Sequence, residues 1–312
     1  MTTAEPTGTP RSAEAPEAED PKAKKPSSPL LKPERSIEGA VLNVFSHGFL
    51  VLWAVLAAGP LLWALMTAFK PSADILASPW GLPDGLHWEN WSNAWSKADI
   101  GRYTLNSFVI VIFSVPLTML FGSMAAYVLA RFDFRGSRIV YFTFVGGMAF
   151  PVVMALVPLF FVMKNLSLLD TRQGLIMVYI AYSMPFTIFF MTTFFRTLPT
   201  SVAEAAEIDG ASHSRIFFQV MLPMARPGLV SVGIFNFLGH WNQYVLPFAL
   251  NQGDEDDYVL TQGIGFLFAQ AGYRADYGRL FAGLMMAALP ILIVYAIFQR
   301  QVQAGLTAGA VK

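Results

Sequence analysis

The feature that most constrains this fold is a series of long apolar stretches that contain no charged side chain. The first runs from Ala40 to Phe69, which is longer than the roughly 20 residues that an α-helix needs to cross a bilayer. Comparable runs follow at about Tyr103–Leu129, Ile139–Met163, Leu175–Phe195, Gly228–Leu250 and Leu280–Phe298. The sequence therefore predicts an all-α polytopic membrane protein with six transmembrane helices.

The overall composition agrees with a lipid-embedded class and excludes several functions. Hydrophobic residues make up 54% of the 312 residues and charged residues 13%, whereas soluble proteins carry about 25% charge. Lys+Arg and Asp+Glu are equal at 21 each, so no excess of positive charge indicates a nucleic-acid partner. Cysteine is absent, which excludes disulfides and thiol catalysis.

Motifs of common enzymes are also missing from the sequence. It contains no Gly-x4-Gly-Lys-Ser/Thr loop for nucleotide phosphates and no Gly-x-Ser-x-Gly nucleophile elbow. The four histidines lie in separate segments without metal-ligand spacing. We therefore expect no catalytic residue, no metal and no cofactor, and any ATP hydrolysis must come from a partner chain.

The chain is predicted to have three parts. Residues 1–36 are rich in Pro, Ala, Glu, Lys and Ser, which indicates a disordered cytoplasmic tail. Residues 37–300 form the six-helix domain, with external loops at 71–102 and 251–279. Residues 301–312 form a cytoplasmic C-terminal tail.

The orientation follows from the basic residues. The short loop after the second span contains Arg131, Arg135 and Arg138, and basic residues favour the cytoplasmic side. With an even number of spans, both termini are predicted to be cytoplasmic, in a bacterial cell membrane.

The cytoplasmic connection 196–227 is far longer than a passive connector needs to be. Thr200 or Ser201 can cap a helix over Val202–Asp209, which has good helix formers and acidic residues near its start. Gly210 then provides a residue that tolerates positive φ, so that the chain can turn.

A second helix is expected at about Ser214–Met221, ended by Pro223. The two helices would form an L-shaped pair on the membrane surface. Two alanines permit close approach by a partner, Ile208 offers an apolar knob, and Glu204 and Asp209 can pair with cations.

This connection resembles the cytoplasmic signature of bacterial ABC import permeases. That signature is Glu-Ala-Ala, three residues, Gly, nine residues, then Ile-x-Leu-Pro. The matching residues are Glu204, Ala205, Ala206, Gly210, Leu222 and Pro223. The resemblance implies a type I ABC importer permease fold, in which the first helix docks into a cleft of an ATPase subunit. The alternative is an amphipathic helix that touches only lipid.

Further motifs resemble the subgroup that serves carbohydrate importers, similar to the smaller maltose permease subunit. They are Phe69-Lys70-Pro71, Glu89-Asn90-Trp91, Asn106-Ser107, Trp241-Asn242 and the closing Gly-Leu-Thr-Ala-Gly-Ala-Val-Lys at 305–312. The overall sequence, with its tail rich in Ala and Gly, also resembles actinobacterial permeases for N-acetylglucosamine or diacetylchitobiose. The implied partners are a second permease subunit, an ATPase dimer, an external sugar-binding protein and the bilayer.

The C-terminal tail resembles the family tail that inserts between the two ATPase subunits. On this resemblance Gly305, Thr307, Gly309 and Lys312 contact the ATPases. The alternative is a frayed terminus.

The fifth apolar run carries an unusual concentration of polar and aromatic side chains. They are Asn236, Trp241, Asn242, Gln243 and Tyr244. Sugars bind through amide hydrogen bonds to hydroxyls and through aromatic faces stacked on the ring, so these residues suit a substrate pathway. The alternative is hydrogen bonding between helices.

The second external loop joins an acidic cluster at 254–257 to an apolar stretch at 263–272, which has no evident core to join. On the resemblance, this loop reaches into the sugar-binding protein. Otherwise it is a solvated connector.

The sequence thus predicts a permease subunit of an ATP-driven ABC importer for a sugar or oligosaccharide. An ABC permease for a polyamine or peptide would share the docking loop. A secondary transporter would be expected to place acidic or basic residues inside the membrane runs, and these runs have none.

Overall fold

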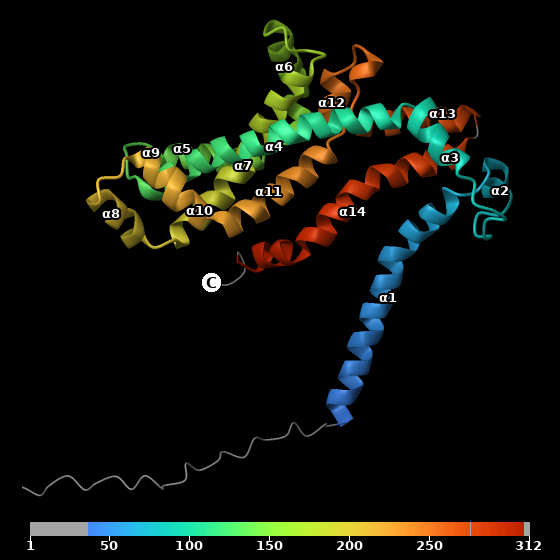
Figure 1. Ribbon diagram of the computed structural model, residues 1–312, viewed down its shortest axis with the longest axis horizontal. Helices are drawn as coiled ribbons and strands as arrows, with labels where there is room; N and C mark the ends of the chain where they lie inside the picture. The colour runs from blue at the N-terminus through green and yellow to red at the C-terminus, as the bar shows by residue number, and fades with distance from the viewer. Residues whose placement is uncertain (1–36, 275, 309–312) are drawn as a thin grey trace, which may run out of the picture. The chain divides into compact units, whose positions relative to one another are not determined.

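The computed structural model describes the backbone of residues 37–274 and 276–308 (Figure 1). The predicted tail 1–36 lies outside the described residues. Within the described ranges the regular elements are all helical, as predicted. The chain divides into two compact units, Met1–Leu56 and Ala57–Lys312, and the boundary falls inside the first helix.

The first unit is described only by the beginning of helix α1, which runs over Ile37–Thr67. Apolar side chains of this part, such as Phe49 and Trp53, are more than half exposed. Their rings stack on one another with centroids 6.5 Å apart. Exposed apolar side chains of this kind are suited to contact with lipid.

Among the described residues, four helices are long and apolar enough to cross a membrane without interruption. They are α1 (Ile37–Thr67), α4 (Ile100–Arg131), α7 (Arg172–Thr197) and α14 (Tyr277–Ala308). Two further pairs of helices pass the same test together, which gives up to six spans if each bent pair counts as one. Each of the six predicted apolar runs is helical, but the third and the fifth are interrupted.

The third predicted run, Ile139–Met163, is two helices and not one. Helix α5 (Ser137–Met148) and helix α6 (Val152–Asn165) meet at an angle of 107°. Pro151 stands at the N-cap of α6, where its missing N–H and fixed φ favour a new helix start over continuation of the old one.

The fifth predicted run, Gly228–Leu250, is also interrupted. Helix α11 covers Arg226–Trp241 and helix α12 covers Val245–Leu250, so residues 242–244 form a break inside the run. At its other end, α11 bends by 78° away from the helical segment His213–Met224.

Helices α4 and α7 form the centre of the second unit, and α11 packs against both of them (Figure 1). Small side chains permit this contact: a Cβ added to Gly122 would lie only 2.5 Å from Thr187 Cγ2. Ala126 is fully buried one turn further on. Gly122 and Ala126 thus let the backbones of α4 and α7 approach one another closely.

The segment 71–102 contains three short helices, α2 (Ser72–Ala77), α3 (Glu89–Ser92) and the π-helix η1 (Asn93–Lys97). Asn90 Nδ2 donates to the carbonyls of Ala68 (3.0 Å) and Lys70 (2.8 Å), which fixes this segment on the end of α1. Two of its tryptophan rings also lie there, since the centroids of Trp88 and Trp91 are 4.9 and 5.3 Å from that of Phe69.

Candidate functional site

The connection 196–227 begins with helix α8 (Thr200–Ile208). The residue before it is Pro199, in an extended conformation, and no side chain caps the helix. The predicted cap at Thr200 or Ser201 is wrong, because these residues already lie inside the first turn. Gly210 has φ +78°, so the predicted left-handed turn after α8 is confirmed.

The second part of the connection is a composite helix. It consists of α9 (His213–Arg215), the π-helix η2 (Ile216–Met221) and α10 (Leu222–Met224). Ser212 caps it by accepting a hydrogen bond from the Arg215 amide at 3.4 Å. Pro223 does not end this helix as predicted, because it lies in the first turn of α10, where a proline is tolerated. The chain turns two residues later, at Ala225.

One side of α8 holds the helix to the bundle. Ala203 and Ala206 pack against a core that includes Ile216, Phe217 and Met221 of η2. The Phe217 ring in turn lies 5.1 Å from the Tyr127 ring of α4. Small alanine side chains thus let the two arms of the connection approach one another closely.

The same core fixes the connection on the ends of α4 and α7. Arg131 Nη2, at the end of α4, donates to the carbonyl of Leu198 at 2.7 Å. Phe195 of α7 is fully buried against Tyr127, with ring centroids 5.5 Å apart. A force applied to α8 would therefore reach both central helices through packed side chains.

The other side of α8 is exposed. Glu204, Ala205, Asp209 and Gly210 all face solvent. Ile208 is 86% exposed, although a large apolar side chain gains free energy when it is buried. An apolar knob between two carboxylates is suited to a partner surface with an apolar pocket and basic residues. Of the remaining signature residues, Leu222 packs inward and Pro223 is exposed.

Polar residues of α11 form buried contacts with both central helices. His240 Nδ1 lies 2.7 Å from Ser114 Oγ of α4, and His240 Nε2 lies 2.8 Å from Ser183 Oγ of α7. In either neutral tautomer one hydroxyl donates to the ring and the other accepts from it. The sequence did not indicate which residues His240 contacts, because the two serines are distant from it in the chain.

Asn236, one helical turn before His240, has a similar environment. Its Nδ2 donates to Thr187 Oγ1 at 2.9 Å, and the residue is buried. For Asn236 the structure thus favours the alternative of helix-to-helix hydrogen bonding.

The break at 242–244 lies beside a pocket of about 390 Å³. Trp241, Asn242 and Tyr244 line one side of it. The other walls come from residues 260–268 of helix α13 (Leu260–Arg274) and residues 280–287 of α14. The structure therefore brings three of the five predicted pathway residues together, with partners that the sequence did not indicate.

Gln243 lies off this pocket and takes part in fixing the break. Its backbone carbonyl accepts a hydrogen bond from Thr261 Oγ1 at 2.7 Å, which ties the start of α13 to the break.

The expectation that the apolar stretch 263–272 has no core to join is wrong, because this stretch lies in helix α13. The stretch 263–272 does join a core: Leu267 and Ala271 are buried together with Ile100 and Tyr103 of α4 and Leu280 of α14. A Cβ on Gly263 would overlap the Tyr103 ring, so glycine permits this close approach. This helix was not predicted, because only one side of it is apolar and its partner helices are distant in the chain.

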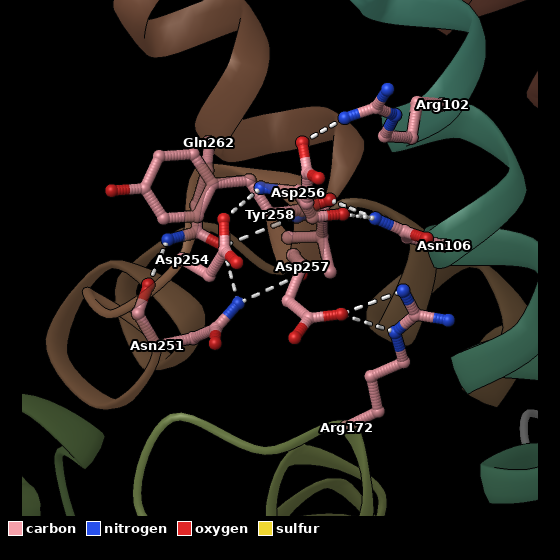
Figure 2. Close-up of polar contacts among 10 residues, drawn as sticks. Arg102, Asn106, Arg172, Asn251, Asp254, Asp256, Asp257, Tyr258 and Gln262 are labelled. Carbon is pink, nitrogen blue, oxygen red and sulfur yellow. Dashed lines mark hydrogen bonds and ion pairs between the residues drawn. The ribbon is translucent and has the colours of Figure 1, made fainter.

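A polar network holds the segment before α13 on the starts of α4 and α7 (Figure 2). It is centred on the 3-10 turn η3 (Glu255–Asp257). Arg102 of α4 pairs with Asp256, and Arg172 of α7 pairs with Asp257 with Nη2 and Oδ1 2.6 Å apart. Asn106 Nδ2 donates to the carbonyls of Asp256 (2.8 Å) and Tyr258 (2.9 Å).

The inner half of this network is buried. Asn251 Nδ2 donates to the Asp257 carbonyl at 3.0 Å, and Gln262 Nε2 donates to the Asn251 carbonyl at 2.6 Å. Burial and the nearby carboxylates raise the pKa of the Tyr258 hydroxyl, which keeps it neutral. The acidic cluster at 254–257 is therefore a structural connection between helices as well as an exposed surface.

The predicted C-terminal tail is only partly described. Helix α14 continues to Ala308, so the backbone at Gly305 and Thr307 is helical, which the sequence did not indicate. The side chains of 302–308 and the whole of Gly309 and Lys312 lie outside the described residues.

Long apolar helices, two interrupted apolar runs and the exposed short helix α8 define a polytopic α-helical membrane protein. The solved structure of a bacterial ABC transporter involved in import of the acidic polysaccharide alginate contains a chain with this fold. The TM-score is 0.72 at 24% identity, over 85% of this chain and 98% of that chain. This likeness supports the fold alone.

The chain belongs to the family of binding-protein-dependent transport system inner membrane components, whose model matches residues 118–306. It is 52% identical over 264 residues to the diacetylchitobiose uptake system permease protein NgcG of Streptomyces coelicolor, covering 85% of this chain and 87% of that protein. It is 30% identical to the trehalose transport system permease protein SugB of Mycobacterium tuberculosis, over 89% of this chain and 98% of that protein. The predicted membership of the ABC import permeases is confirmed.

Proposed function

We propose that this chain is the membrane-spanning subunit of an ATP-driven importer for a sugar or short oligosaccharide. The observation that carries the choice of substrate is its 52% identity, over 85% of its length, to a diacetylchitobiose uptake permease. A disaccharide of N-acetylglucosamine is accordingly the first substrate to test. ATP hydrolysis is assigned to a partner chain.

Coupling to that partner is assigned to the exposed side of α8. Ile208 enters an apolar recess of an ATPase subunit, while Glu204 and Asp209 pair with cations at its rim. The positive φ of Gly210 sets the angle between α8 and the composite helix that follows. Closure of the ATPases then moves α8, and the core around Phe217 transmits this movement to α4 and α7.

The substrate route is assigned to the break between α11 and α12. Trp241, Asn242 and Tyr244 lie together there, beside a pocket large enough for a sugar ring. Gln243 shapes the break through its backbone. Asn236 and His240 hold α11 to the central helices and are not given a substrate contact.

The orientation places α8 and both termini in the cytoplasm and the 251–279 segment outside. The basic loop Arg131–Arg138 lies at the same end of α4 as the connection 196–227, which supports this assignment. In this orientation an external sugar-binding protein meets the segment 251–279, and a second permease subunit completes the route. The C-terminal residues Gly305, Thr307, Gly309 and Lys312 are assigned to the ATPase contact.

The direct experiment is uptake of labelled sugars by cells that lack this chain and by the same cells with the chain restored. The panel should contain N,N'-diacetylchitobiose, trehalose, a polyamine and a short peptide. We expect the loss and recovery of uptake for a sugar only. Recovery of polyamine or peptide uptake would assign the chain to a different class of importer. A sugar signal that persists when ATP is depleted, but not when ion gradients are removed, would indicate a secondary transporter.

A further inference from the structure

The pocket beside the break between α11 and α12 has the size of a small-molecule site. Its volume of about 390 Å³ falls in the range of about 300–1,000 Å³ that is usual for such sites. It is formed by the break itself, by α13 and by the first turns of α14. Because three separate segments form its walls, the pocket depends on the packing of the whole region.

The aromatic walls of the pocket are held in place before any ligand arrives. Trp241 is buried, its Nε1 donates to the Ala287 carbonyl at 3.2 Å, and its ring lies edge-on to Phe108 with centroids 4.8 Å apart. Tyr244 lies against the backbone of α13, where a Cβ added to Gly265 would stand 3.1 Å from Tyr244 Cε2. Fixed aromatic faces bind a flat apolar surface with little loss of conformational entropy.

Part of the lining is accessible, and part of it is polar. Tyr244 is 42% exposed and Phe268 is 69% exposed, so two aromatic rings border the opening. Asn242 contributes an amide and Thr261 a hydroxyl. This combination matches a pyranose, whose axial C–H groups form an apolar face and whose edge carries hydroxyls.

None of the described residues that line this pocket is charged. Charged groups are nevertheless close in the structure. A second pocket of about 180 Å³, also bordered by α13, is lined by Lys97, Asp99 and Glu255. Helix α13 therefore separates a charged pocket from an uncharged one.

We propose that the larger pocket binds one ring of an uncharged sugar, with the ring face against Tyr244 and Phe268 and its polar edge toward Asn242 and Thr261. The proposal rests on the proposed function in sugar import and adds a selectivity to it. A uronate or a free amino sugar would have to bury its charge where no opposite charge compensates for the lost water, which is strongly unfavourable. An N-acetylated or plain neutral ring has no such cost.

The binding test uses the full-length chain purified into lipid nanodiscs and saturation-transfer NMR on the free sugars. The probes are N,N'-diacetylchitobiose, chitobiose at a pH that keeps its amines protonated, and a diuronate. We expect saturation transfer to the ring and acetyl protons of diacetylchitobiose, and signals at least about tenfold weaker for both charged probes. Equal transfer to all three probes, or to none, overturns the proposal. Transfer to none of the probes would fit an acyl chain or a partner helix as the occupant of the pocket.

Three variants test whether the saturation-transfer signal comes from this pocket. Tyr244→Ala removes the ring, and we expect a signal about three- to tenfold weaker, as for the loss of one aromatic stack. Tyr244→Phe keeps the ring and should retain most of the signal. Tyr273→Ala is the matched control, because Tyr273 is 94% exposed on α13 and does not line the pocket. An unchanged signal in Tyr244→Ala, in protein that is monodisperse and folded, overturns the proposal.

Uptake assays separate a failure of this proposal from a failure of the proposed function. If cells lacking the chain still import the sugar normally, the function in sugar import is wrong. If import depends on the chain but Tyr244→Ala restores it at the wild-type maximal rate, only the pocket assignment is wrong. For Tyr244→Ala we expect a lower maximal rate of import. The half-saturation concentration should change little, because an external binding protein captures the sugar first.

Discussion

Arg172 and Asp257, 85 residues apart in the sequence, form an ion pair in which Nε and Nη2 of the arginine lie 2.8 and 2.6 Å from Oδ1 of the aspartate. The pair joins the first turn of α7 to η3, directly before the segment that leads into α13. Both side chains are more than a third exposed, so water and salt screen their attraction. The buried amides beneath them are therefore expected to hold this region more strongly than the visible ion pair.

The first prediction compares the exposed ion pair with the buried amides. Arg172→Ala should lower the free energy of unfolding by only about 0.2–1 kcal/mol, the usual value of an exposed pair. Asn251→Ala should cost about 1–3 kcal/mol, because Asn251 is 1% exposed and its loss leaves buried polar groups without partners. Thermal unfolding of the two variants in the same detergent shows which of them loses more stability. A larger loss in Arg172→Ala would show that the ion pair dominates.

The second prediction concerns the histidine that bridges α4 and α7. Ser114→Ala should cost about 0.6 kcal/mol, the average for a hydrogen bond between membrane helices. His240→Leu should cost about 2 kcal/mol, because it removes both contacts and leaves the hydroxyls of Ser114 and Ser183 buried without this partner. Thermal unfolding of both variants tests this, and equal effects would argue against a bridge through the ring.

The third prediction concerns the exposed knob on α8. Ile208→Ala should change the free energy of unfolding by less than about 0.5 kcal/mol, because the side chain is 86% exposed. Binding of the ATPase subunit should weaken by about five- to thirtyfold, as for loss of a central interface residue. Co-purification of the ATPase with tagged permease measures this.

A control for Ile208→Ala is available on a different helix. Ile297→Ala, on α14, removes an equally apolar side chain that is 63% exposed and far from α8 in the sequence. It should leave ATPase binding unchanged. Equal losses of binding in the two variants would contradict a specific role for Ile208.

The fourth prediction concerns the C-terminal residues. Truncation after Gln303 should leave insertion intact, because Ser231 Oγ still contacts the Gln301 carbonyl at 3.1 Å. ATPase co-purification and sugar uptake should both fall. A truncated permease that assembles and transports at wild-type levels would show that this end is only a helix terminus.

The sequence predicted where apolar helices lie but not where they bend. A run of apolar residues indicates burial in lipid, and it has the same composition whether the helix is straight or broken. Pro151 gave a usable signal for the break between α5 and α6, since it stands at the helix start. The break at 242–244 also had a signal in Pro247, which has no N–H to donate to the Gln243 carbonyl four residues earlier. The partner that this carbonyl finds instead, Thr261 Oγ1, is distant in the chain and was not predictable.

For the candidate sites too, local structure was predictable from the sequence and contacts between distant residues were not. Residues Glu204–Gly210 were predictable because α8 is a local structure, and the left-handed Gly210 follows from its residue type. The pocket was predictable only in its Trp241–Tyr244 wall. Its α13 wall and the His240 bridge are contacts between residues far apart in the sequence, and spacing along the chain carries no information about them.

Coupling of sugar import to the ATPase through α8 is tested most directly at Gly210, where φ is +78° and proline would be fixed near −65°. Cells lacking the chain should receive the wild type, Gly210→Pro, or Gly136→Pro, which alters a second glycine of positive φ (+95°) outside α8. The measurement is ATP-dependent uptake of labelled diacetylchitobiose, normalised to the permease present in the membrane. We expect that the wild type restores uptake, that Gly136→Pro retains most of it, and that Gly210→Pro inserts but restores less than about a tenth. Full uptake with Gly210→Pro, or normal uptake without the chain, would contradict this coupling.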